Sequence, residues 1–430
     1  MISRFKCIEC GREYSLDEIR FKCDCGDLLE VVSDLASFGR TGDDWRREFE
    51  SGKDRIAFAR YKDMLLPDLP DGEIVTLLEG DTPLYRAGDR IREHIDVDEL
   101  YLKHEGMNPT LSFKDRGMVA GVSWAKHLGV RRVACASTGD TSAALAAYAA
   151  RAGLQCIVLL PKGKISLEQL SQAISFGAVV LQLETDFDGC MRVVKEVTER
   201  CGVYLLNSMN SVRIEGQKAI AIEALHQLDW DVPDFVVVPV GNAGNISAVG
   251  KGIRELYELG VIDRKPRLVG VEAEHANPVY VSYVDGFSEL KPITAKKTVA
   301  SAMQIGDPVS FKKAVRELRY FDGLMEQASE TEIMDAKAII DRSGVPACPN
   351  SAAAVAGLRK LRDKDVVTKS DKVVVVLSAH GSKFSGAAND YYLDEQSEFS
   401  NLPVTVEPTA DAVEEALAAH PSAGRSREGH

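Results

Sequence analysis

Residues 132–161 have the sequence RVACASTGDTSAALAAYAARAGLQCIVLLP, and this stretch decides the fold. Its apolar runs at 132–136 and 155–161 predict two buried strands, and the alanine-rich segment at 141–152 predicts the helix that joins them. A further helix is expected from about Leu167 to Phe176. Continuous apolar strands that alternate with helices indicate a parallel sheet that is covered on both faces.

The same alternation extends through most of the chain. Strands are predicted at residues 73–87 (strand and turn), 99–103, 178–183, 235–240, 268–272 and 373–377, and helices at 42–65, after Lys114, after residue 183 and, in the tail, at 409–417. Residues 422–430 are polar and predict no ordered structure. We therefore expect an α/β protein with two helix-flanked, parallel-sheet domains.

The composition favours an enzyme that acts on small metabolites. The chain of 430 residues is long enough for two or three domains, and its formal net charge is −13. Nucleic-acid binding usually needs a basic face, and because no run of lysine and arginine supplies one, no nucleic-acid partner is expected. No apolar run is long enough to cross a membrane. The start, Met1–Cys7, lacks the apolar core of a signal peptide, and together with nine cysteines this predicts a cytoplasmic location.

Residues 1–30 stand apart as a short, loop-like segment that contains two close cysteine pairs. Cys7 and Cys10 are separated by two residues, and Cys23 and Cys25 by one. Four thiolates can surround one zinc ion in a tetrahedral, structural site, which has no open position for catalysis. The short second pair strains that geometry, so free thiols without a metal remain the alternative. The other cysteines are scattered and are interpreted as small core residues: Cys135, Cys156, Cys190, Cys201 and Cys348.

A lysine between a turn and a predicted helix start is the first candidate for chemistry. Residues 108–117 have the sequence NPTLSFKDRG, in which the lysine is Lys114. A lysine amine forms a Schiff base with an aldehyde cofactor when it is held in place and is neutral part of the time. A surface lysine at a helix start explains the segment equally well, and the rest of the chain decides between the two interpretations.

Three loops follow predicted strands, at the edge where open α/β sheets bind ligands. Residues 137–141 combine hydroxyls with a helix N-terminus, which suits a carboxylate or phosphate, although the hydroxyls could simply cap the helix. Residues 241–245, GNAGN, bring backbone N–H groups together and predict a phosphate cup, with a tight turn as the alternative. Ser378 adds a neutral hydroxyl at a strand end, where a cap is the plainer explanation.

A fourth polar segment, residues 207–218, offers donors for a second phosphate. Arg213 supplies a charge-assisted donor, and Asn207 and Ser208 supply neutral ones. An Arg213 that lies on the surface and pairs with Glu215 is the alternative.

Together, a Schiff-base lysine, a phosphate cup and a neutral strand-end hydroxyl are the components of a pyridoxal phosphate site. The chain resembles threonine synthase, a family of pyridoxal phosphate enzymes with the tryptophan-synthase-β-like fold (fold type II). The resemblance runs from about Glu73 to Lys383 and rests on the order and spacing of these motifs: residues 79–84, the Lys114 segment, 137–143, 207–218, 241–245, 301–308 and the Ser378 strand end. The sequence alone suggests no chemistry for residues 301–308.

The resemblance implies a role for each site residue. Lys114 would carry the cofactor as a Schiff base and act as catalytic acid and base, Phe113 would pack near the ring, and Ser378 would face the pyridine nitrogen. The phosphate of the cofactor would lie in a cup formed by Gly241, Asn242, Ala243, Gly244 and Asn245. The substrate carboxylate would bind to Ser137, Thr138 and Thr141, and the substrate phosphate to Asn207, Ser208 and Arg213.

Two positions depart from the family pattern. Asp140 replaces the usual asparagine beside the phenolic oxygen of the cofactor, where an ionised carboxylate would repel that oxygen. Asp140 is therefore expected to be protonated, turned away or offset by a cation. Leu111 replaces the usual glycine of the lysine segment and could alter the approach to the ring.

The resemblance implies conversion of O-phospho-L-homoserine and water to L-threonine and phosphate, by a homodimer. The alternatives are a serine or threonine ammonia-lyase or a cysteate synthase-like enzyme on the same fold, and a non-catalytic sensor that binds pyridoxal phosphate. The expected organisation is a cysteine-rich segment (1–30), a large cofactor domain formed by 31–115 and 206–398, a smaller α/β domain (116–205) and a tail (399–430).

Overall fold

The computed structural model describes residues 1–137, 139–162, 167–185 and 187–419. It divides into two units, Met1–Phe384 and Ser385–His430. The second unit contains α15 (Ser385–Tyr392) and α16 (Ala410–Ala419), and α16 confirms the helix predicted in the tail. Residues 422–430, for which no order was predicted, lie outside the described residues.

The larger sheet of the first unit has six strands in the order β12-β11-β10-β13-β5-β4. Its strands pair in parallel except for β4, which runs antiparallel to β5. The bounds are β4 (Leu84–Arg86), β5 (Glu99–His104), β10 (Phe235–Pro239), β11 (Arg267–Ala273), β12 (Leu324–Ala328) and β13 (Lys372–Leu377). Central β10 is buried along its whole length, as expected for a strand covered on both faces.

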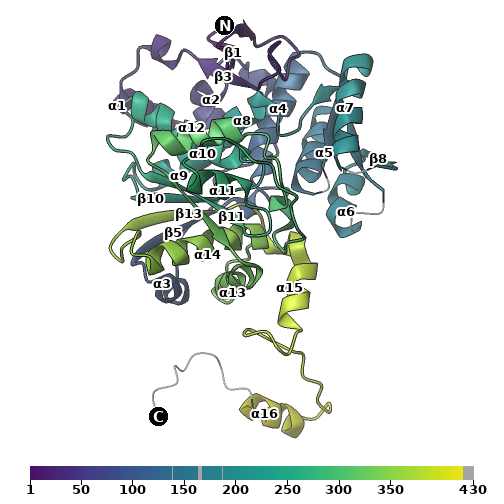
Figure 1. Ribbon diagram of the computed structural model, residues 1–430, viewed down its shortest axis with the longest axis vertical. Helices are drawn as coiled ribbons and strands as arrows, with labels where there is room; N and C mark the ends of the chain where they lie inside the picture. Colours follow the sequence, from purple (N-terminus) through teal and green to yellow (C-terminus); the bar gives the residue numbers. More distant parts are fainter. Residues whose placement is uncertain (138, 163–166, 186, 420–430) are drawn as a thin grey trace. The chain divides into compact units, whose positions relative to one another are not determined.

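Helices cover both faces of this sheet (Figure 1). On one face lie α9 (Ala219–Gln227), α10 (Gly244–Glu258) and α12 (Phe311–Tyr320), and on the other α3 (Asp89–Ile95), α13 (Glu330–Asp341) and α14 (Pro349–Asp363). Successive strand residues accordingly enter different core clusters. Val236 and Val238 pack in one cluster and Val237 in the other, because side chains alternate across a strand.

The smaller sheet has four parallel strands in the order β8-β7-β6-β9. Its strands are β6 (Arg132–Ala136), β7 (Gln155–Pro161), β8 (Val179–Leu183) and β9 (Tyr204–Leu205), and its helices are α5 (Asp140–Ala152), α6 (Leu167–Ser175) and α7 (Phe187–Cys201). Helix α4 (Lys114–His127) packs against α5. The two helix-flanked, mainly parallel sheets confirm the predicted fold class, whereas the predicted domain boundaries stay a prediction.

The cysteine-rich N-terminal segment is more ordered than the sequence indicated. It was predicted to be loop-like, but it forms an antiparallel sheet of β1 (Ser3–Cys7), β2 (Glu13–Ser15) and β3 (Leu29–Ser33), in the order β2-β1-β3. These strands are short, and β1 alternates buried and partly buried residues, a weak signal in five residues. The remaining helices of the first unit are α1 (Gly42–Ser51), α2 (Ala57–Leu65), α8 (Ser211–Gln217) and α11 (Pro278–Val284).

Four of the five scattered cysteines are buried as predicted, whereas Cys201 is exposed, so its interpretation as a core residue was wrong. Cys201 is the last residue of α7 and precedes Gly202, which turns the chain towards β9.

Among the described residues, no helix combines the length and the apolar character needed to cross a membrane.

Candidate active site

The lysine loop is bound by its backbone to the carboxyl end of β13. The N–H of Phe113 donates to the carbonyl oxygen of Ser378 at 2.9 Å, and the N–H of His380 donates to that of Leu111 at 3.0 Å. Lys114 directly follows Phe113 and is the first residue of α4. Two segments far apart in sequence, the Lys114 loop and the Ser378 strand end, therefore lie side by side.

Leu111 adopts the backbone conformation that favours glycine. Its φ is +64°, a left-handed value that costs an ordinary residue about 1–2 kcal/mol. Asp115 helps to hold this turn, because its buried carboxylate accepts hydrogen bonds from the N–H and the hydroxyl of Thr110 at 2.8 and 2.7 Å. Burial raises the pKa of Asp115 to about 7. The turn before Lys114 thus keeps its shape without glycine.

The amine of Lys114 lies in a poorly solvated setting with charged groups of both signs nearby. Its Nζ is 3.6 Å from the centroid of the Phe113 ring. Burial lowers the pKa of Lys114 to about 7; the cations Arg213 and Lys383 lower it further, and Asp140 opposes them. About half of the amine is therefore neutral near pH 7, the form that attacks a carbonyl carbon.

Lys383 forms an ion pair with Asp140 and was not singled out from the sequence. Its Nζ lies 2.8 Å from Oδ1 of Asp140 and donates to the carbonyl oxygen of Thr110 at 2.9 Å. Asp140 is the first residue of α5, a helix that flanks the smaller sheet, whereas Thr110 belongs to the lysine loop. Of the three states expected for Asp140, the structure has the one in which a cation offsets the carboxylate.

The loop between β10 and α10 contains residues 241–245, which were predicted to form a phosphate cup. Ala243, the residue before α10, has a φ of +60°. A Cβ at Gly241 would lie 3.0 Å from the carbonyl oxygen of Ala302, so only glycine fits there without a shift. The N–H of Ser310 donates to the carbonyl oxygen of Asn242 at 3.1 Å. The segment around 301–310, for which the sequence suggested no chemistry, thus backs the cup.

Unpartnered polar atoms surround this cup. Both amide atoms of Asn245 and the hydroxyl of Ser310 are buried and have no hydrogen-bond partner among the described residues. The same is true of the hydroxyl of Ser112, next to Phe113. A buried polar group without a partner costs about 1–3 kcal/mol, so this clustering indicates that a polar ligand completes the site.

Ser378 lies in a pocket of small polar side chains. Its Oγ is 3.3 Å from Oγ of Ser351 and 3.8 Å from Sγ of Cys348. Cys348 caps α14 through the N–H of Ser351, and it is among the groups that influence the pKa of Lys114. Sequence reasoning did not place Cys348 or Ser351 at the site, although Pro349, directly after Cys348, is a helix-start signal.

Arg213 is buried, so the surface pair of Arg213 with Glu215 was wrong. Its side chain is 3% exposed, and burial lowers its pKa to about 10. Nη1 donates to the carbonyl oxygen of Leu206 at 3.1 Å, while Nε has no partner among the described residues. Glu215 instead pairs with Lys218 at 2.7 Å and Lys251 at 2.5 Å.

Two glycines of α4 make room for Arg213. A Cβ at Gly117 would lie 3.2 Å from the carbonyl oxygen of Arg213, and one at Gly121 would lie 3.1 Å from its Cγ. Lys114, Gly117 and Gly121 have the i, i+3, i+7 spacing of one helix face. The Arg213 side chain therefore lies along the face of α4 that begins with Lys114.

The remaining predicted residues occupy the ends of the smaller sheet. Asn207 accepts a hydrogen bond from the N–H of Ala136, the last residue of β6, at 2.9 Å. Ser137 is the next residue and is partly buried, as is Ser208, whereas Thr141 in the first turn of α5 is buried. Thr138 lies outside the described residues.

A buried ionic network fixes the start of α4. Arg116 contacts Glu105 at 2.6 Å and Glu223 at 2.7 Å, and Lys103 reaches Glu223 at 2.5 Å. Thr82, from the motif at 79–84, donates through its hydroxyl to Glu105 at 2.8 Å. That motif is therefore part of the framework that positions Lys114.

Comparison with known proteins gives consistent matches. Residues 75–379 match the family model described as "Pyridoxal-phosphate dependent enzyme". "Threonine synthase 2, chloroplastic" of Arabidopsis thaliana is 45% identical over 421 residues, 94% of this chain and 82% of that protein. "Threonine synthase" of Methanocaldococcus jannaschii is 43% identical over 384 residues, 89% of this chain and 93% of that protein.

Solved structures resemble the chain at lower identity. Threonine synthase from Escherichia coli superimposes with a TM-score of 0.69 at 19% identity, covering 96% of this chain and 94% of that one. Threonine deaminase isoform 2 from Solanum lycopersicum gives a TM-score of 0.64 at 21% identity, covering 78% and 94%. At such identities the likeness shows the fold alone.

Proposed function

The chain belongs to the pyridoxal-phosphate dependent enzymes and, within them, to the threonine synthase family, and on this premise we propose that it converts O-phospho-L-homoserine and water to L-threonine and phosphate around Lys114. It is an enzyme of the lyase type, and the fold is the tryptophan-synthase-β-like fold implied by the sequence.

The residues present fit pyridoxal phosphate. The cup at residues 241–245 offers backbone N–H groups at the start of α10, a setting that suits a phosphate dianion. The unpartnered amide of Asn245 and hydroxyl of Ser310 supply further donors there. Ser378 can form a hydrogen bond with the ring nitrogen without forcing that nitrogen to be protonated. A carboxylate in the same place would force it to be protonated.

Lys114 performs the proton transfers in this proposal. When bound, pyridoxal phosphate supplies an electron sink for the carbon from which a proton is removed. The Nζ of Lys114 would hold the cofactor and, when not bonded to it, would take the α- and β-protons of the substrate and return protons later. Its pKa of about 7 suits both directions of transfer near neutral pH.

The other residues hold the two ends of the substrate. Ser137, which precedes α5, and Thr141, in its first turn, are proposed to bind the carboxylate, which the positive end of the helix dipole favours; the same role for Thr138 rests on the sequence alone. Arg213, Asn207 and Ser208 are proposed to bind the γ-phosphate. Stabilising its charge as the C–O bond breaks favours its departure, after which water adds at the β-carbon.

The burial of Arg213 on the helix face of Lys114 is the observation that carries this proposal. Arg213 is 3% exposed and its Nε has no partner among the described residues, so its buried charge is costly unless an anion binds it. A phosphorylated substrate supplies that anion, whereas serine and threonine have no second anionic group to reach Arg213. The arrangement therefore favours a threonine synthase over an ammonia-lyase.

The decisive assay incubates the purified holoenzyme with O-phospho-L-homoserine and measures phosphate and threonine together. We expect equal amounts of the two products. Phosphate without threonine would contradict the proposal and indicate elimination to a keto acid. The matched control substrates are L-serine and L-threonine, from which an ammonia-lyase, but not this enzyme, would release ammonia at a comparable rate.

The pair of Asp140 and Lys383 is expected to control the affinity for the cofactor. Lys383→Met leaves the carboxylate of Asp140 without its partner at 2.8 Å, so Lys383 no longer offsets its repulsion of the anionic phenolic oxygen of the ring. We expect the dissociation constant of pyridoxal phosphate, measured by titrating the apoenzyme, to rise about tenfold or more.

The double variant Asp140→Asn/Lys383→Met separates this effect from general damage. It removes both charges, so most of the lost affinity should return. A double variant that binds no better than Lys383→Met would show that the ion pair does not act through the cofactor.

Three further properties stay predictions from the sequence. They are a homodimeric state, a cytoplasmic location and the lack of a nucleic-acid partner, and the roles assigned above to individual residues are likewise proposals.

A further inference from the structure

The four N-terminal cysteines converge on one point. The sulfur atoms of Cys7, Cys10, Cys23 and Cys25 all lie within 4.8 Å of one another. Two of the separations, Cys7 to Cys25 and Cys10 to Cys23, are 3.5 Å. A zinc ion bound tetrahedrally at about 2.3 Å from each sulfur requires sulfur–sulfur separations of about 3.8 Å. The side chains are thus arranged as a set of four around a common centre.

Two glycine turns bring the cysteines of each pair to the same side. Gly11 and Gly26 follow the second cysteine of their pairs, with φ values of +71° and +90°. Their N–H groups donate to the carbonyl oxygens of Cys7 at 3.2 Å and Cys23 at 2.8 Å. Only glycine adopts these conformations without strain. The turn at Gly26 brings Cys23 and Cys25 to the same centre although only one residue separates them.

We propose that Cys7, Cys10, Cys23 and Cys25 bind one Zn²⁺ ion, and that this metal stabilises the attachment of the N-terminal sheet to the helices of the enzyme. Four sulfur ligands in a tetrahedral arrangement are typical of structural zinc and leave no position for water or substrate. The site is therefore separate from the chemistry around Lys114.

The sheet that the metal closes is attached through the edge of β3. Within the described part of the chain, this strand pairs only with β1, so its other edge is open to the helices. Lys313 donates to the carbonyl oxygen of Leu29 at 2.6 Å, and Lys251 donates to that of Val31 at 2.6 Å. Between these two carbonyls, Glu30 pairs with Arg316 at 2.8 Å.

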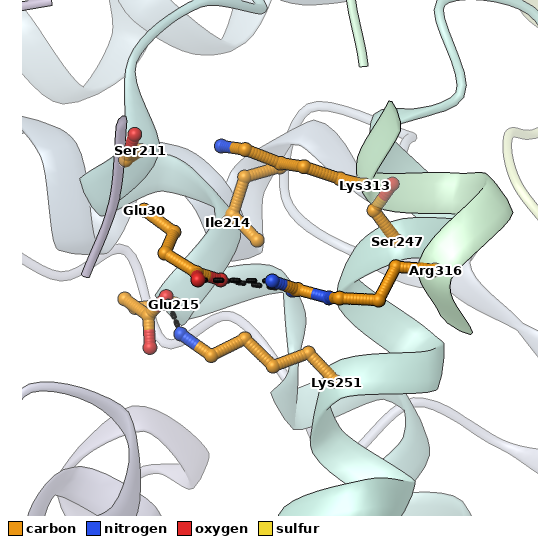
Figure 2. A pocket seen from close by; sticks show the side chains of 8 residues that line it. All are labelled: Glu30, Ser211, Ile214, Glu215, Ser247, Lys251, Lys313 and Arg316. Carbon is orange, nitrogen blue, oxygen red and sulfur yellow. Dashed lines mark hydrogen bonds and ion pairs between the residues drawn. The ribbon is translucent and has the colours of Figure 1, made fainter. Parts of the chain in front are cut away.

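Figure 2 shows this junction as a small pocket between β3 and helices α8, α10 and α12. The lining residues are Glu30, Ser211, Ile214, Glu215, Ser247, Lys251, Lys313 and Arg316. Lys251 reaches Val31 and Glu215 together, so it joins β3 to α8. Lys313 and Lys251 bind backbone oxygens of β3 and Arg316 binds its Glu30, so these polar contacts depend on that strand keeping its position.

The attachment reaches the two helices that carry Lys114 and Arg213. The hydroxyl of Ser211, the first residue of α8, donates to the carbonyl oxygen of Leu29, and Arg213 lies two residues further along that helix. The indole of Trp124 in α4 donates to the carbonyl oxygen of Leu16 at 3.2 Å. Leu16 lies in the loop between the two cysteine pairs. A metal that fixes this segment therefore also supports α4 and α8.

The test is the metal content of the full-length enzyme, purified without a histidine tag and under reducing conditions, then measured by mass spectrometry for zinc and iron. We expect about one zinc per chain. Cys10→Ser and Cys25→Ser should each lose the zinc and unfold at a lower temperature. The matched control is Cys201→Ser, which removes an exposed cysteine outside the cluster and should keep both the zinc and the melting temperature.

A measurement on the wild-type chain keeps the proposal testable even if the variants fail to fold. A thiol-specific mercurial should release the zinc, detected by a colorimetric chelator, and lower the melting temperature. Wild-type enzyme with no zinc, with iron in its place, or with the four cysteines found as disulfides by mass spectrometry would overturn the proposal. None of these results depends on the assay for threonine, so the two proposals fail separately.

Discussion

Replacing Lys114 by alanine is expected to abolish threonine formation and to remove the absorbance band of the bound cofactor at the same time. The Nζ of Lys114 is the proposed covalent attachment point and the proposed acid and base, so a single substitution removes both functions. Loss of a positioned proton-transfer group alone lowers turnover by about 10²–10⁴-fold, and loss of the attachment point adds to this. Spectra of the purified variant and product assays at saturating cofactor measure the two effects.

A second lysine close to the site, Lys383, is not expected to take over the function of Lys114. Lys383 also lies close to the site, but its Nζ is already engaged by the carboxylate of Asp140 and by the carbonyl oxygen of Thr110. The matched control is Lys126→Ala, which removes an exposed lysine from the last turn of the same helix and should leave the band and the rate unchanged. An unchanged band in Lys114→Ala would contradict the assignment.

The sequence predicted the central strands well because local signals there agree. The strands at 132–136 and 155–161 were predicted with the bounds that the structure has, since apolar runs are bounded by turn residues on both sides. Strand β12, with the sequence LMEQA, was missed. It lies at the edge of the sheet and contains Glu326, whose carboxylate pairs with Lys364, so neither an apolar run nor simple alternation marks it.

The candidate site was predicted where it depends on strand ends and missed where it depends on distant contacts. The loops after β6, β10 and β13 follow from the pattern of parallel strands, because their carboxyl ends meet at one edge. The pairing of Asp140 with Lys383 joins residues more than 200 positions apart, and no local pattern encodes it. Ser310 and Cys348 were missed for the same reason, since only the folded chain brings them to the cup and to Ser378.

The alternative of a surface pair between Arg213 and Glu215 failed for a simpler reason. Residues two positions apart on a helix point in different directions, so Arg213 and Glu215 of α8 cannot face one another. Helix geometry alone could have excluded the surface pair, once a helix was assigned to residues 211–217. Glu215 faces Lys218 and Lys251, while Arg213 faces the glycines of α4.

Arg213→Ala is expected to lower kcat/KM for O-phospho-L-homoserine about 10³-fold while the absorbance band of the cofactor remains. Removing one partner of a buried, hydrogen-bonded charge pair costs about 2–5 kcal/mol, which corresponds to a loss of this size. The cofactor is held by other residues, so its spectrum tests whether the variant is correctly folded. Steady-state kinetics with phosphate release as the signal measure the loss.

The control for this variant is Arg200→Ala, which removes an exposed arginine from α7 and should leave kcat/KM within about twofold of the wild type. The reaction with an unphosphorylated substrate is as informative as the reaction with O-phospho-L-homoserine. If Arg213 binds the substrate phosphate, any slow side reaction with unphosphorylated L-serine should fall far less than the reaction with O-phospho-L-homoserine, because serine has no group to bind there. An Arg213→Ala variant that keeps its full rate with the phosphorylated substrate would show that buried Arg213 does not bind the substrate phosphate. The fold would then be equally compatible with an ammonia-lyase.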